Sequence, residues 1–156
     1  MAYAVVRTDG LAGTTAGSLL RSAVSEQKMQ NGSVVKLVKL VEGERELYSA
    51  EEAKDAKMGQ FALVAAPEKQ YDARQHNPDE FTNEKGTPFR CYVLTHGDEF
   101  SVTAEGFSAT PEVNHKVGLP ASGYTWETGE SVTTEVGTII SIESESGYTY
   151  YVVRID

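Results

Sequence analysis

The sequence contains little of what disulfide-stabilised, membrane or nucleic-acid-binding proteins need. Cys91 is the only cysteine among 156 residues, so no internal disulfide can form. No apolar run approaches the roughly 20 residues of a membrane-spanning helix. Basic residues total 14 and acidic residues total 23, which gives a formal charge of -9 that repels phosphate backbones and anionic lipids. We therefore expect neither a nucleic-acid partner nor a membrane partner.

The first residues also lack the basic and apolar segments of a signal peptide, so we expect synthesis and folding in a cytoplasm. Hydrophobic residues make up 40% of the chain, which is enough to build the core of one domain of ordinary size.

Residue types that carry out catalysis or bind metals are few and unfavourably spaced. His76, His96 and His115 lie in expected turns or loops, without the close spacing of a zinc-binding pair. Cys91 lies within an expected strand, where a thiol acts as a small hydrophobic side chain. The sequence thus predicts no catalytic residue, no cofactor, no metal ligand and no enzymatic activity. A small hydrolase that uses its abundant carboxylates is the enzymatic alternative.

Short apolar segments separated by turn signals every 8–12 residues predict a mainly β fold. We expect a small β-sandwich or barrel-like domain, or domains, with hairpins and at most one or two short helices. Residues 19–24 fit either a short helix or an alternating strand, and residues 50–58 fit a helical turn or two. The expected strands are 33–41 with 45–50, the core strand 61–66, a hairpin of 87–95 with 99–103, and a hairpin of 137–143 with 148–155.

The chain is expected to divide into an extended N-terminal arm at residues 1–18 and a β domain at residues 19–156. Residues 9–18 are rich in Gly, Thr and Ala, which suits an arm that lies flat on another chain, although a disordered terminus is the alternative. The β domain is either continuous or split by the polar loop at residues 68–86. A long polar loop inside a compact chain often makes contact with a partner.

Aromatic residues crowd into the C-terminal third of the chain, and large aromatic side chains are favoured at interfaces. The alternative is that they pack a sheet face, as β-propensity alone would predict. The residues we predict at a partner interface are Tyr3, Arg7, Leu11, Tyr71, Phe81, Tyr124, Trp126, Tyr148 and Tyr150.

Three stretches carry a resemblance to a known group of proteins. They are VVRTD at 5–9, NGSVV at 31–35 followed by VEGERELY at 41–48, and YVLTHGDEF at 92–100. In this order they resemble small proteins of tailed phages that infect Gram-positive hosts, encoded near the major capsid protein and taken as head decoration, or cement, proteins. The resemblance covers the first hundred residues and does not extend to the C-terminal third.

The resemblance implies a structural protein on the outside of the virion, which binds the major capsid protein and stabilises contacts between its subunits. It also implies a homo-oligomer, with a trimer favoured. A carbohydrate- or protein-binding β module of a phage fibre or surface protein is the alternative, since the Tyr and Trp side chains would serve either kind of partner.

Overall fold

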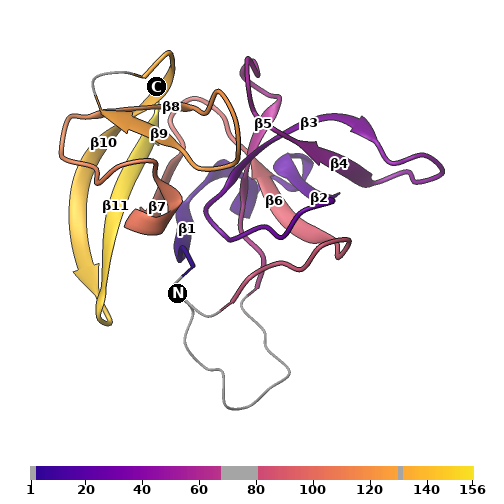
Figure 1. The fold of residues 1–156 in the computed structure, drawn as a ribbon, viewed down its shortest axis with the longest axis horizontal. Helices are drawn as coiled ribbons and strands as arrows, with labels where there is room; N and C mark the ends of the chain where they lie inside the picture. Colours follow the sequence, from indigo (N-terminus) through magenta and orange to yellow (C-terminus); the bar gives the residue numbers. More distant parts are fainter. Residues whose placement is uncertain (1–2, 68–80, 130–131) are drawn as a thin grey trace.

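The structure is a computed structural model that describes residues 3–67, 81–129 and 132–156. It confirms the expected fold class, because the chain is mainly β and its strands form two sheets, one closed into a barrel (Figure 1). The described helices are single 3-10 turns: η1 (Ala12–Thr14), η2 (Gly17–Leu19) and η4 (Ala104–Gly106). None of the described helices has the length and apolar character needed to cross a membrane.

The barrel is formed by five strands in the order β2-β4-β3-β5-β6. Strand β2 runs parallel to β4, and the other pairs are antiparallel. The strands are β2 (Leu20–Val24), β3 (Val34–Leu40), β4 (Leu47–Glu51), β5 (Phe61–Val64) and β6 (Phe89–Val93). All four residues of β5 are buried, as expected for a continuous apolar segment inside a barrel.

The second sheet has six strands in the order β1-β7-β11-β10-β8-β9, all antiparallel. The strands are β1 (Val6–Gly10), β7 (Glu99–Thr103), β8 (Lys116–Leu119), β9 (Glu127–Gly129), β10 (Thr134–Glu145) and β11 (Tyr148–Ile155). Strands β10 and β11 form the long hairpin on the left of Figure 1 and extend beyond the other strands.

One continuous apolar core joins the barrel to the six-stranded sheet. Trp126 lies at its centre, 0% exposed, with its ring against Phe61 of β5 and Phe100 of β7. Its indole Nε1 donates a hydrogen bond of 2.9 Å to the carbonyl oxygen of Gly32, which precedes β3. Gly32 has a φ of +87°, and a side chain there would meet Val102 at 2.8 Å, so the Asn-Gly turn allows the two sheets to approach closely.

Several sequence-based predictions of strand pairing are confirmed. Strands β3 and β4 form an antiparallel hairpin around residues 41–46, and β10 and β11 form the C-terminal hairpin. Residues 20–24 form strand β2, which was one of the two alternatives for that segment. The helical turns expected at 50–58 are wrong, because β4 continues to Glu51 and turns follow it.

The hairpin predicted for residues 87–103 is wrong in its pairing. Both strands exist, but β6 pairs with β2 and β5 in the barrel, while β7 pairs with β1 and β11 in the other sheet. The turn at residues 95–98 therefore carries the chain from one sheet to the other. The buried carboxylate of Asp98 fixes this crossing by accepting hydrogen bonds from the main-chain N–H groups of Ala12 and Thr95, both at 2.9 Å.

Residues 3–18, for which an extended arm is predicted, lie within the folded body. Strand β1 pairs with β7, and Leu11 is 3% exposed in the core. The polar segment at 68–86 connects β5 to β6, two neighbouring barrel strands, and its residues 68–80 lie outside the described residues. The chain enters the barrel between β1 and β2, and it returns to the six-stranded sheet only at the 95–98 turn.

Candidate partner-binding groove

Two surface depressions of about 640 and 510 Å³ share Tyr124 in their lining, and we call them together the Tyr124 groove. The groove brings together segments that are far apart in the sequence. The larger depression is also lined by Glu26, Ser49, Glu51, Glu52 and Lys85, and the smaller one by Tyr3, Lys28, Gln30, Thr82 and Thr125. Two residues predicted at an interface, Tyr3 and Tyr124, thus lie in one surface feature.

Tyr124 is positioned by its own main chain and by the residue two places later. Its carbonyl oxygen accepts a hydrogen bond of 3.0 Å from the N–H of Val34, and Trp126 anchors the same segment in the core. Its half-buried ring packs against a second buried apolar cluster, to which Val35, Val64 and Phe89 of the barrel strands belong. Burial raises the pKa of the Tyr124 hydroxyl, the charge of Glu52 raises it further, and a hydrogen bond with Ser25 opposes the rise.

Tyr3 is held at the smaller depression by polar contacts around it. The ammonium group of Lys28 donates a hydrogen bond of 3.2 Å to the Tyr3 hydroxyl and lies 5.6 Å from the centre of its ring. The hydrogen bond with Tyr3 raises the pKa of Lys28. The following residue, Ala4, donates its N–H to the side chain of Gln30 at 2.9 Å, which fixes the chain entering β1.

A second cluster of predicted interface residues lies on the six-stranded sheet. The guanidinium of Arg7 on β1 donates to the carboxylates of Glu143 and Glu145 on β10, each at 2.5 Å, and to Ser101 at 3.2 Å. It also lies 4.2 Å above the ring of Tyr150. Burial lowers the pKa of Arg7, and the hydrogen bonds to both carboxylates outweigh this and raise it.

This cluster ties the edge strand β1 to the long hairpin, across β7 and β11. Tyr148 and Tyr150 pack edge to face in the same region, with ring centres 6.4 Å apart. Arg7 covers the ring of Tyr150, which is only 6% exposed, so Tyr150 supports the sheet rather than presenting an open ring to a partner.

The structure corrects two further interface predictions. Trp126 and Leu11 are buried in the core that joins the two sheets, so neither side chain can contact a partner in this fold. Phe81 is half-buried beside Thr82, which lines the Tyr124 groove, and Tyr71 lies outside the described residues. Sequence reasoning missed Lys28 and Gln30, because only the fold places their short polar segment beside the N-terminal tyrosine.

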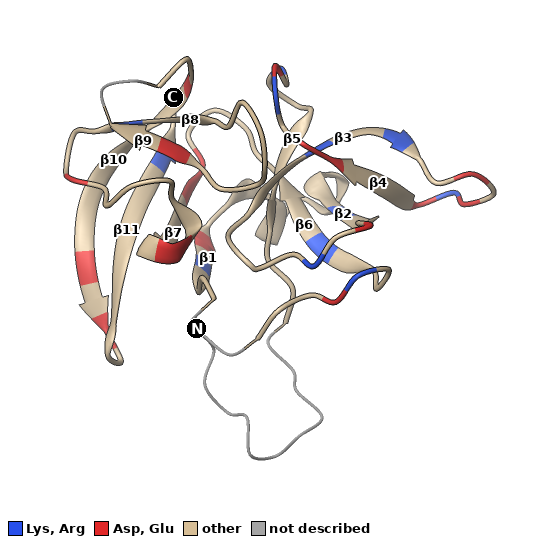
Figure 2. Ribbon diagram, in the orientation of Figure 1, with Lys and Arg blue, Asp and Glu red and all other residues tan. Residues whose placement is uncertain are grey.

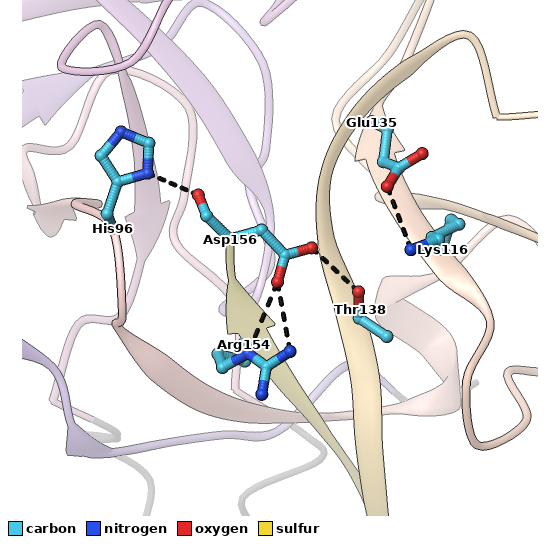
Figure 3. A network of polar contacts seen from close by, with 6 residues as sticks. All are labelled: His96, Lys116, Glu135, Thr138, Arg154 and Asp156. Carbon is cyan, nitrogen blue, oxygen red and sulfur yellow. Dashed lines mark hydrogen bonds and ion pairs between the residues drawn. The ribbon is translucent and has the colours of Figure 1, made fainter.

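His96 takes part in a hydrogen-bond network, and Cys91 is buried. The Nδ1 atom of His96 lies 2.5 Å from the main-chain oxygen of Asp156, whose carboxylate accepts hydrogen bonds from Thr138 and Arg154 (Figure 3). This network connects the 95–98 turn to the ends of β10 and β11. Burial raises the pKa of the Cys91 thiol to about 12.

His115 lies beside Glu112 at 3.4 Å, and His76 lies outside the described residues. Within residues 3–67, 81–129 and 132–156, no three His, Cys, Asp or Glu side chains gather in a way that could hold a metal ion.

Comparison with known proteins identifies no relative, since no family model, no curated protein and no solved structure matches this chain.

Proposed function

We propose that this protein is a structural protein that binds the outer surface of a phage capsid and stabilises contacts between major capsid subunits. The resemblance of residues 5–9, 31–48 and 92–100 to head decoration proteins suggests the partner. Two of these stretches hold residues on which the fold depends: Gly32 accepts the hydrogen bond from Trp126, and Asp98 fixes the crossing between the sheets. Such residues are the ones a shared fold would retain.

The observation that carries the proposal is the Tyr124 groove. Its two tyrosines, Tyr3 and Tyr124, are far apart in the sequence, and both are held by neighbouring contacts before any partner arrives. Aromatic side chains that are fixed in advance lose little conformational freedom on binding, and they dominate the energy of many interfaces. A groove of this kind suits a rigid protein that binds a repeated surface.

The charges in the groove indicate which part of a capsid subunit would fit it. Glu26, Glu51 and Glu52 line the larger depression together with one basic residue, Lys85. This larger, acidic depression, which Tyr124 also lines, complements a loop that carries Lys or Arg, since a cation can also lie against the aromatic face. We therefore infer that the groove receives a basic loop of the major capsid protein.

Binding to capsids that lack decoration tests the proposal. Tyr124→Ser should weaken binding about tenfold or more, because it removes the aromatic side chain shared by both depressions. Tyr48→Ser is the matched control, since Tyr48 is also half-buried and packs on the same apolar cluster but does not line the groove. Co-sedimentation of each folded variant with capsids measures the difference. Equal binding by the two variants would exclude the groove as the capsid contact.

In the carbohydrate-binding alternative, Trp126 cannot contact a sugar because it is buried. The aromatic side chains left for that role are the tyrosines of the Tyr124 groove. A glycan array would detect it. Specific sugar binding that Tyr124→Ser abolishes and Tyr48→Ser retains would favour that reading over the capsid.

A further inference from the structure

The outer half of β10 has one open edge. Strand β8 pairs with β10 only as far as Thr138, and the main chain of Ile139 bonds to Asn114 and His115. Beyond that point, β10 pairs only with β11 among the described residues. Natural sheets usually protect a long open edge with charged side chains, lysine above all, or with proline; residues 140–145 contain no lysine or proline, and their two charged residues, Glu143 and Glu145, are paired with Arg7. The same stretch carries Ile142, which is 43% exposed.

A second open edge of the molecule lies on strand β3. Strand β5 pairs with residues 34–36 of β3, and Leu37 donates its N–H to Gln60, which leaves residues 38–40 bonded only to β4 within the described chain. This short edge carries two of the large exposed apolar side chains, Val38 at 52% and Leu40 at 41% exposure.

The two edges lie on opposite sides of the molecule and carry opposite charge. Figure 1 places β3 and β4 on the right and β10 and β11 on the left, and Figure 2 shows basic residues on β3 and acidic residues on the outer half of β10. Lys36 and Lys39 form no ion pair within the described residues. Glu143 and Glu145 both pair with the guanidinium of Arg7, so one net negative charge remains beside the open edge of β10.

We propose that copies of this chain associate head to tail, with the open edge of β3 in one copy lying against the open edge of β10 in the next. Val38 and Leu40 pack against Ile142, and Lys39 of β3 faces the carboxylates of β10. Because the two halves of this contact are different surfaces, the association produces a closed ring or an open chain of subunits rather than a two-fold dimer. It is a property of the chain itself and does not depend on the capsid proposal.

Charge substitutions on the exposed side chains test this contact, with native mass spectrometry and sedimentation velocity as the readouts. Wild-type protein should form oligomers as its concentration rises. Ile142→Asp blocks the β10 half and Leu40→Asp blocks the β3 half, so each variant alone should be monomeric. Ala121→Asp is the control, because Ala121 is exposed and follows β8 at the opposite end of β10, where Leu119 pairs with Thr134, and this variant should associate like wild type.

Mixing the two blocked variants gives the decisive result. The intact β3 of Ile142→Asp can meet the intact β10 of Leu40→Asp, so the mixture should form a one-to-one heterodimer and nothing larger. If Ile142→Asp is monomeric while Leu40→Asp associates normally, the contact is a two-fold pairing of β10 edges and the proposal is wrong. Wild-type protein that stays monomeric up to its solubility limit, or loss of association in the control Ala121→Asp as well, would also overturn it.

Discussion

Replacing Trp126 with phenylalanine should destabilise the protein strongly although the core stays apolar. The substitution removes the indole donor and leaves the buried carbonyl oxygen of Gly32 without its partner. An unsatisfied buried acceptor costs about 1–3 kcal/mol. The smaller ring also leaves a void between Phe61 and Phe100, so we expect a total loss of about 2–4 kcal/mol in unfolding free energy.

Urea denaturation followed by far-ultraviolet circular dichroism measures this loss. Since the core around Trp126 belongs to both sheets, wild type and variant should each unfold in one transition with the same dependence on urea. The exposed substitution Val113→Ala should change the unfolding free energy by less than about 0.5 kcal/mol. A loss below about 1 kcal/mol for Trp126→Phe, or two separate transitions in wild type, would refute the view that this residue joins the two sheets.

Three further predictions concern single side chains. Asn31→Ala should lower the melting temperature and cost about 2–3 kcal/mol, because the buried amide holds both the N–H and the carbonyl of Ala66; a loss under about 0.5 kcal/mol would show that water replaces it. Arg7→Gln should cost about 1 kcal/mol, and the difference should shrink in about 1 M salt, since its carboxylate partners are exposed while its contact with Tyr150 does not depend on salt; a difference unchanged by salt would contradict this. The raised pKa of Cys91 means that the unfolded thiol ionises above pH 9 while the folded one does not until about pH 12. This stabilisation is complete below pH 9 and lost between pH 9 and 12, so Cys91→Ala should show a shallower fall in unfolding free energy over that range.

The sequence is sufficient to predict strands and local hairpins, because both depend on neighbouring residues. The alternation in 148–155 and the turn at 42–44 are enough to define β11 and the β3–β4 hairpin. The pairing of β6 and β7 was not predictable in this way. Gly97 and Asp98 form a turn in either case, and contacts distant in the sequence direct the chain into the other sheet, among them the hydrogen bond that the N–H of Ala12, 86 residues away, donates to the carboxylate of Asp98.

The candidate site was predictable only in part, for the same reason. Residue type alone placed Tyr3 and Tyr124 at a surface, and both line the groove. Residue type also placed Trp126 and Leu11 there, and both are buried, because an aromatic or leucine side chain suits a core as well as an interface. The sequence could not predict that Val38 is exposed either. The alternating pattern of strand β3 continues beyond residue 36, where the pairing of β3 with β5 ends.

Electron microscopy tests most directly the proposal that this protein decorates a capsid through the Tyr124 groove. Undecorated capsids incubated with an excess of folded protein should show ordered density on the outer shell, with the groove between Tyr3 and Tyr124 facing the capsid. Bare capsids under the same conditions, or bound protein with the groove turned to solvent, would contradict the account.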